Sequence, residues 1–399
     1  MEQKRLCPYC MGELPPAADS CVHCGKVFAG RNPAGCLPVG TVLAGRYTVG
    51  EMRSLDGEGI LYRGVENLGC FRVTIKEYLP VTLSAERGAD CILQPKTGSE
   101  VLFKTTRMDF ADLYRALERI TPATGLEAVL DVVEANNTVY AVMENLGGTP
   151  LDQWLEAQGA PLRPDNACAM LQPVFEGVAA MHKIGLVHRG ICLENLRVMA
   201  DGRCRLAGYA TVGLRTAGSG LREQLYEGYS APEQYSTAEF EGRYTDEYGL
   251  AAVFYRMVCG QAPVPAAQRM VSDSNPRART VNSAVPGYVS DVLQMGLRLK
   301  PMERIQTVPQ LVQALSACGD DIGSVLGDYD PAVGAWIRFN PLDGKGIRNE
   351  NVTAFRYALV ECDGMDIDRQ NALIRELELP VACLVHSGGK SVHAIVHID

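Results

Sequence analysis

The sequence lacks long apolar runs. None of its 399 residues lie in a stretch approaching the roughly 18 apolar residues that a membrane helix needs, and the first residues show no secretory signal pattern. We therefore expect no contact with a membrane, and we expect the protein to lie in the cytoplasm.

The sequence also has fewer positively charged than negatively charged residues. The chain has 38 Lys and Arg residues against 47 Asp and Glu residues, which gives a formal net charge of −9. This balance argues against broad electrostatic binding to nucleic acid, although it leaves room for a local basic patch. An apolar fraction of 47% and a charged fraction of 21% are ordinary for a soluble globular protein, and the length suggests two or three domains.

Cysteine, by contrast, is abundant, with 14 residues. Most are scattered singly in apolar surroundings, which fits buried thiols in a reducing compartment. Four others form the pattern C-x2-C-x10-C-x2-C within "CPYCMGELPPAADSCVHCG": Cys7, Cys10, Cys21 and Cys24. Two such turns can present four thiolates in a tetrahedron, which suits a structural zinc ion, whereas the alternatives are a redox pair or disulfides.

The cysteine segment is too short to bury a core of its own. Residues 1–27 resemble a zinc ribbon, in which the metal would stabilise the fold, and His23 is a competing ligand inside the second pair. Residues 28–41 are rich in Gly and Pro and are predicted to form a linker.

Residues 42–318 contain a series of motifs in a recognisable order. "FRVTIKEYLP" places Lys76 at the end of a β-branched run, "GLVHRGICLENLRVMADGRCRLAGYAT" follows a predicted helix, and "YEGYSAPEQY" and "PMERIQTVPQLVQAL" come later. Together these motifs resemble a bacterial serine/threonine protein kinase. The resemblance implies a two-lobed α+β kinase-like fold in which Asp246 heads a helix and Glu233 pairs with Arg304.

Several residues on which phosphoryl transfer depends in that family are absent from this sequence. Gly190 and Gly208 stand where the family carries its two catalytic-centre aspartates, while Lys76 and Asn195 are retained. The phosphate-binding loop aligns to "SLDGEG", which keeps Gly59 but has Ser54 and Asp56 at the other two glycine positions. The partner of the lysine aligns to Leu113, and a shift of one residue would bring in Asp112.

The missing residues are those that take part in phosphoryl transfer, whereas residues that support the fold, such as His188 and Arg189, remain. We therefore predict a catalytically impaired pseudokinase that acts as a regulatory or scaffolding module with a protein partner. Lys76, Gly59 and Asn195 leave ATP binding open, and Mg²⁺ binding is doubtful because its main carboxylate is absent. The alternative is a divergent serine/threonine protein kinase that is active and binds ATP.

Residues 319–399 have no counterpart in a kinase. "FRYALVECDG" predicts a buried strand that ends in Glu361 and Asp363, a pair suited to a divalent metal, and "HSGGKSVHAIVHID" brings Lys390, Ser391 and His393 together as a nucleotide motif. The segment resembles part of an archaeo-eukaryotic-type primase, a partial α/β palm. The alternative is that Glu361 and Asp363 are only the polar end of a strand. Nucleic acid is expected as a partner only if this module is completed, in which case the kinase-like part would regulate a mobile-element primase-polymerase.

Overall fold

The computed structural model divides the chain into two compact units, Met1–Asp321 and Ile322–Asp399. No helix among the described residues is long and apolar enough to cross a membrane. The structure describes residues 5–7, 9–10, 12–15, 18–27, 32–120, 125–210, 225–236, 239–316, 357–360, 366–377, 381–387 and 391–397.

The first unit begins with a small cysteine-containing module, whose two strands β1 (Arg5–Leu6) and β2 (Glu13–Leu14) pair antiparallel. The segment predicted to be a linker packs against the sheet that follows it. Leu37 is fully buried, and its N–H donates to the hydroxyl of Tyr62 at 3.0 Å. The amide of Asn32 donates to the carbonyl oxygens of Leu37 and Gly50 at 2.8 and 3.0 Å. Residues 32–41 are thus part of the packed domain.

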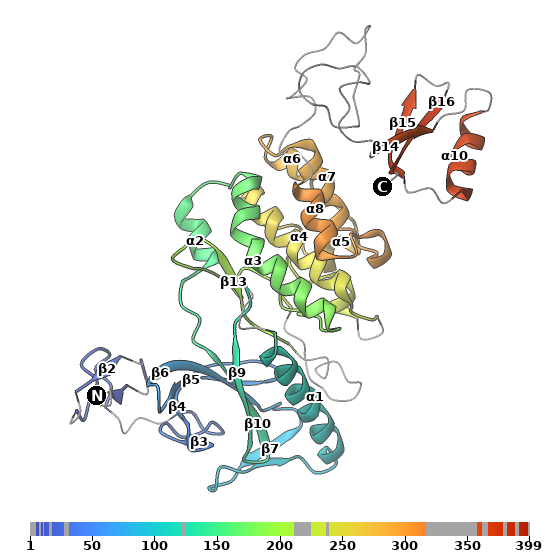
Figure 1. The fold of residues 1–399 in the computed structure, drawn as a ribbon. Coiled ribbons are helices and arrows are strands. Elements are labelled where there is room, and N and C mark those ends of the chain that lie inside the picture. Colours follow the sequence, from blue (N-terminus) through green and yellow to red (C-terminus); the bar gives the residue numbers. More distant parts are fainter. Residues whose placement is uncertain are drawn as a thin grey trace. The chain divides into compact units, whose positions relative to one another are not determined.

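The N-lobe, residues 32–146, is built on one antiparallel sheet of order β3-β4-β5-β6-β10-β9 (Figure 1). The run "TVYAVM" is buried throughout because its strand lies inside this sheet, and helix α1 contacts the same strand and its neighbour. An Asn-Asn turn joins β9 to β10, with Asn136 and Asn137 at φ of +53° and +57°. The elements are β3 (Val42–Leu43), β4 (Tyr47–Leu55), β5 (Gly59–Glu66), β6 (Phe71–Tyr78), β7 (Ser84–Arg87), β8 (Leu93–Pro95), α1 (Glu100–Glu118), β9 (Val129–Ala135) and β10 (Thr138–Glu144).

The C-lobe, residues 149–316, is mainly helical (Figure 1). Helix α3 begins at Pro164 with Asp165 in its first turn, and it contacts α4 and α8. Helix α4 is buried on nearly all sides, so it forms the centre of the lobe. The elements are β11 (Thr149–Pro150), α2 (Leu151–Gln158), α3 (Pro164–Lys183), β12 (Leu196–Val198), β13 (Cys204–Leu206), η3 (Pro232–Tyr235), α4 (Arg243–Cys259), α5 (Ala266–Arg269), α6 (Ala278–Val281), α7 (Gly287–Gly296), η4 (Pro301–Glu303) and α8 (Val308–Ser316).

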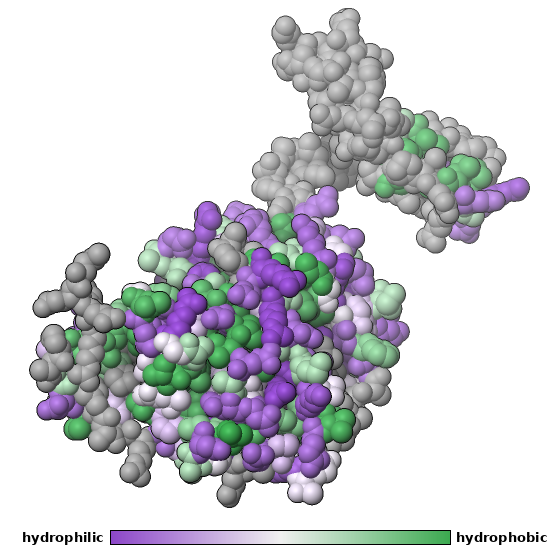
Figure 2. Space-filling view, turned by 60° about the horizontal axis from the view of Figure 1, so that its bottom comes forward, coloured by the Kyte–Doolittle hydropathy of each residue, from purple (hydrophilic) through white to green (hydrophobic). Residues whose placement is uncertain are grey.

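The large apolar side chains of both lobes gather inside the first unit. Tyr47, Tyr248 and Phe254 are among those that are almost completely buried. On the face seen in Figure 2, the remaining apolar side chains are interspersed with hydrophilic ones. Burial of the core therefore accounts for most of the hydrophobic content of this unit.

A buried ion pair ties the helical lobe together. The guanidinium of Arg304 donates to both carboxylate oxygens of Glu233, at 2.7 and 2.8 Å, and neither side chain is exposed. Thr245 also donates to this carboxylate, at 2.9 Å. The predicted pairing of Glu233 with Arg304 is confirmed, and it joins η3 to the segment before α8.

The second unit is a three-stranded antiparallel sheet of order β14-β16-β15 with one helix, α10, against β16. The strand predicted to end in Glu361 and Asp363 is present as β14, but it is not fully buried. Leu359 and Val360 are exposed, and β14 is an edge strand that pairs only with β16 among the described residues. The elements are β14 (Tyr357–Val360), α10 (Ile367–Glu376), β15 (Val381–Ser387) and β16 (Ser391–His397).

The ion pair of the C-lobe leads to a stability prediction. Arg304→Met should lower the free energy of unfolding by about 3–5 kcal/mol, because it leaves the carboxylate of Glu233 buried without its partner. The matched control is Arg277→Met, which breaks an exposed pair with Asp291 and should cost less than about 1 kcal/mol. Urea denaturation followed by circular dichroism measures both values, and equal losses would contradict the prediction.

Candidate functional site

A cavity of about 290 Å³ lies between the N-lobe and the C-lobe. Its N-lobe wall comes from β4, β5, β6 and the turn between β4 and β5, and its C-lobe wall comes from the loop after α3 and the segment after β13. The cavity brings together four residues singled out from the sequence, namely Lys76, Gly190, Asn195 and Gly208. It is therefore the candidate functional site.

Lys76 lies deep in this cavity, and its ammonium group is already neutralised by the N-lobe itself. It is 6% exposed, and it forms a close ion pair with Glu58, which is 1% exposed. The carboxylate of Asp56 lies 3.5 Å from the same nitrogen, which also donates to the carbonyl of Tyr209 at 3.2 Å. Burial by itself would lower the pKa of Lys76, but the charge of Glu58 outweighs it and holds that pKa well above its usual range.

The two carboxylates reach Lys76 because residues 56–59 form a tight turn. Asp56 accepts the N–H groups of Glu58 and Gly59, both at 2.8 Å, in a side-chain-stabilised turn. A side chain at Gly59 would clash with the carbonyl of Glu77 on β6, so this glycine permits close strand packing. The close packing of β5 against β6 therefore explains the glycine at position 59, and no bound ligand is needed to explain it.

Asn195 is held by its neighbours in the C-lobe. Its side-chain amide donates to the carbonyl of Gly190 at 2.7 Å and to the hydroxyl of Tyr226 at 3.1 Å. Gly208 has φ of +81°, and a Cβ there would lie 2.5 and 2.6 Å from the amide nitrogen and oxygen of Asn195. The backbone at 208 thus fits closely against Asn195, with no room for a side chain.

The loop that carries Gly190 is organised by one buried carboxylate, that of Asp246 at the start of α4. It accepts the backbone N–H groups of His188 and Arg189 at 2.7 and 2.8 Å, and it bonds the ring of His182 at 2.8 Å. Burial would raise the pKa of Asp246, but the hydrogen bonds from His182 and from the backbone N–H of His188 help to lower it. Arg189 is thereby held at φ of +67°, an unfavourable conformation for a residue with a side chain.

His188 is a packed residue, as expected. It is fully buried, and its Nδ1 accepts the N–H of Gly190 at 3.2 Å. Burial lowers the pKa of His188 to about 4, so the ring is neutral at physiological pH.

Comparison with known proteins identifies the fold. The family model described as "Protein kinase domain" matches residues 116–315, which is half of the chain. The chain belongs to the protein kinase domain family. The two-lobed architecture and the order of motifs predicted from the sequence are thus confirmed.

Relatives of this kinase domain are named as serine/threonine kinases. Serine/threonine-protein kinase PknL of Mycobacterium tuberculosis is 26% identical over 291 residues, which cover 70% of this chain and 67% of the relative. PknE of the same species is 29% identical over 198 residues, or 47% of this chain and 34% of the relative. A solved structure titled "PpkA-294 apo form" matches with a TM-score of 0.56 and 25% identity, covering 71% of this chain and all of the other.

Two features of the kinase domain were not anticipated from the sequence. The partner of Lys76 is Glu58 in the phosphate-binding loop, not a residue of α1. Asp112 is exposed and lies near Arg115, Leu113 is buried, and Tyr114 is the α1 residue that lines the cavity. The glutamate inside "SLDGEG", one residue before a strand, was the only signal in the sequence for Glu58.

Glu127 is the second unanticipated residue. It is 7% exposed, lines the cavity, and forms no side-chain hydrogen bond or ion pair that we observe within the described ranges. Burial, reinforced by the charge of Glu144, raises the pKa of Glu127 to about 8. A carboxyl group that is mostly protonated at neutral pH therefore faces the cavity.

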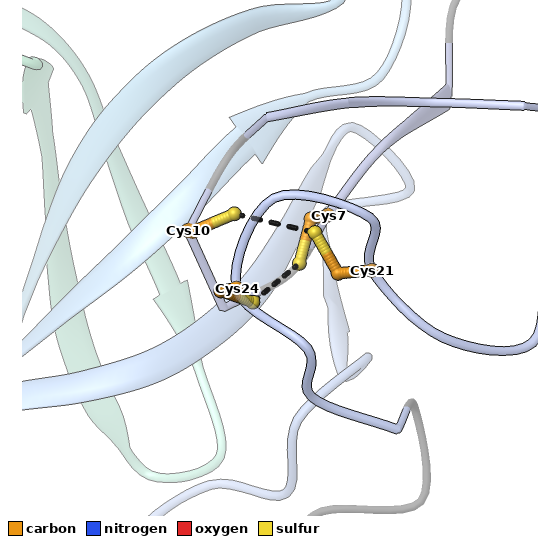
Figure 3. Close-up of side chains that lie close together, drawn as sticks. All are labelled: Cys7, Cys10, Cys21 and Cys24. Atoms are coloured by element: carbon orange, nitrogen blue, oxygen red, sulfur yellow. Dashed lines mark hydrogen bonds between the residues drawn. The ribbon is translucent and has the colours of Figure 1, made fainter.

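The cysteine module brings its four predicted ligands together (Figure 3). All four sulfur atoms lie within 4.8 Å of one another, with Cys7 to Cys24 at 3.9 Å and Cys10 to Cys21 at 3.5 Å. Sulfur atoms about 2.3 Å from one tetrahedral zinc ion would be about 3.8 Å apart, so the cluster fits zinc. The backbone N–H groups of Tyr9 and His23 point at sulfur, at 3.4 and 3.3 Å, which favours the thiolate form.

His23 is not one of the ligands. Its Nε2 lies 2.9 Å from the carbonyl oxygen of Glu13, so the ring is used to close the module. Among the described residues, the four cysteines are the only group of three or more His, Cys, Asp or Glu side chains arranged to hold a metal.

The residues predicted for the C-terminal module are only partly described. Glu361, Asp363 and Lys390 lie outside the described residues. Ser391 and His393 belong to β16, where His393 is opposite Val385 of β15. The metal pair and the nucleotide motif stay predictions from the sequence.

The contact between Gly208 and Asn195 is testable by adding a single methyl group. Gly208→Ala should lower the free energy of unfolding by about 1–3 kcal/mol more than Gly202→Ala, because of overpacking. Gly202 is the matched control, since it has φ of +79° with nothing within 4 Å of the position that a Cβ would take, and it therefore reports only the backbone cost of about 1–2 kcal/mol. Thermal denaturation measures both, and Asn195→Ala should relieve part of the difference. Equal losses at 202 and 208 would show that the site has room for a side chain.

The cysteine cluster predicts metal content. The purified chain should contain one zinc ion per molecule, and Cys7→Ser with Cys21→Ser should remove it because two thiolates cannot complete the tetrahedron. Cys168→Ser, a partly buried cysteine on α3, is the control and should leave the metal content unchanged. Elemental analysis of freshly reduced protein gives the ratio, and a metal-free wild type would contradict the prediction.

Proposed function

We propose that the kinase domain is a pseudokinase, a regulatory or scaffolding module that engages a protein partner and does not transfer phosphate. The observation that carries this proposal is the pair of glycines at 190 and 208, packed against Asn195 in place of two carboxylates. Phosphoryl transfer needs one carboxylate to orient the attacking hydroxyl and another to hold the metal. Neither position offers an oxygen ligand from a side chain.

The residues present fit ATP with Mg²⁺, the cofactors that the family implies, only poorly. Lys76 would normally contact phosphate, but here Glu58 and Asp56 share its charge. A triphosphate entering this space would have to displace a buried ion pair and approach two carboxylates. Asn195 alone is a weak site for a hard cation that prefers several charged oxygen ligands.

The second candidate function is that of a divergent serine/threonine kinase. Its support is the family itself, since the relatives in Mycobacterium tuberculosis are named as serine/threonine kinases. Lys76 and Asn195 are also retained at the positions that match the family motifs. The two candidates differ in whether phosphate is transferred at all.

A transfer assay with labelled ATP and Mg²⁺ separates them. We expect no incorporation above background into the chain itself or into a generic basic protein, because removing one preorganised electrostatic group costs about 10²–10³ in rate and here two are absent. Gly190→Asp with Gly208→Asp should stay near background, since Asn195 and Glu58 still obstruct the site.

The control for this assay is Lys76→Met with Glu58→Gln, which removes the ion pair without leaving a buried charge unpaired. The wild type and this variant should give the same background. Incorporation by the wild type that this variant abolishes would establish the active kinase and overturn the proposal.

A further inference from the structure

The cavity also contains two arginines, one from each lobe. Arg53 lines it from β4 of the N-lobe, and Arg197 lines it from β12 of the C-lobe. Apolar side chains such as Leu61, Met143 and Leu146 line the same cavity. Two guanidinium groups from opposite lobes therefore border one space.

Neither arginine forms an ion pair with a carboxylate among the described residues. Arg53 forms no hydrogen bond or ion pair in the part of the chain that the structure describes. Although Arg53 is exposed, partial desolvation and the charges of Arg63 and Arg197 lower its pKa, and the charge of Glu127 acts in the opposite direction. An anion placed here would relieve that repulsion.

The guanidinium of Arg197 has more hydrogen-bond donors than its bonds to the described residues use. Its guanidinium donates to the carbonyl oxygens of Gly147 and Gly148, at 2.8 and 3.1 Å, in the segment that joins the lobes. A guanidinium has five N–H donors, so these two bonds fix its plane and leave others for a ligand. Arg197 is thus pre-oriented by the backbone.

The carboxyl of Glu127 adds a second feature that points to a ligand. It is more than nine-tenths buried, lines the same cavity and has no side-chain partner among the residues described. Burial and the charge of Glu144 raise its pKa, whereas Arg53, Arg205 and Lys76 act in the opposite direction. With a pKa of about 8 it is mostly neutral at pH 7, so it can donate a hydrogen bond instead of repelling an anion.

We propose that the cavity binds a small organic anion, a carboxylate or a phosphate ester, between Arg53 and Arg197, with Glu127 contacting its polar body. A volume of about 290 Å³ is at the lower limit of small-molecule sites, which favours a compact metabolite. The inference does not rest on loss of phosphoryl transfer, because the proposal for that loss uses Gly190, Gly208 and Asn195 and does not use Arg53, Arg197 or Glu127.

The test is equilibrium binding to the full chain by calorimetry and thermal shift, with glycerol 3-phosphate and succinate as probes. Chloride is added to keep ionic strength constant, so that general screening does not mimic binding. We expect saturable stabilisation by at least one probe, and the probe that binds identifies the anion as phosphate ester or carboxylate.

The deciding variant is Arg53→Leu, which should weaken that binding at least tenfold, as loss of a charge-assisted contact does. Arg72→Leu is the matched control, an exposed arginine on β6 that does not line the cavity, and it should leave the dissociation constant unchanged. Wild-type binding should weaken above pH 8 as Glu127 ionises, and Glu127→Gln should remove that loss. Saturable binding by neither probe, or equal affinity in Arg53→Leu and wild type, would overturn the proposal.

Discussion

The buried carboxylate of Asp246 is the constraint on which the C-lobe site depends. It would be costly to bury without partners, and it obtains them from His182 and from the backbone N–H groups of His188 and Arg189. These bonds join the end of α3, the loop after it and the start of α4. They also hold Arg189 in an unfavourable backbone conformation, so the position of Gly190 is imposed from outside the cavity.

This arrangement separates the scaffold of the kinase domain from its chemistry. The carboxylate of Asp246 and the Glu233–Arg304 pair do not line the cavity and are intact, so the lobe keeps its shape. Inside the cavity, the charges differ from those that phosphoryl transfer requires. Lys76 is neutralised by Glu58, the backbone packs closely at Gly208, and two arginines without an ion-pair partner among the described residues line the same space. A fold can keep its structure while the electrostatics of its cavity change, because the two depend on different residues.

The cysteine module depends on a different stabilising interaction. It has almost no core beyond Cys7, Tyr9, Leu14 and Cys21, so a metal is the natural means of stabilising it. It also contacts the N-lobe, since Lys26 pairs with Glu51 of β4 and its charge lies over the ring of Tyr9. Together with the packed segment around Asn32 and Leu37, these contacts make the module an extension of the lobe.

The sequence by itself determined the features that are local in the chain. Cysteine spacing predicted the four-sulfur cluster, because short-range turns depend on neighbouring residues. The two lobes and the Glu233–Arg304 pair, whose residues are 71 positions apart, were implied by the resemblance of the ordered motifs to a kinase. The glycines at 190 and 208 could likewise be read directly.

Only the tertiary structure decided which side chains meet in the cavity. Successive residues of a helix point about 100° apart, so a shift of one position decides whether Leu113 or Tyr114 faces Lys76, and the sequence does not fix that rotation. Glu58 reaches Lys76 because a turn folds back across the sheet, and Arg53 meets Arg197 because two lobes close over one space. Electrostatic attraction depends on distance in space, and that distance exists only once the chain has folded.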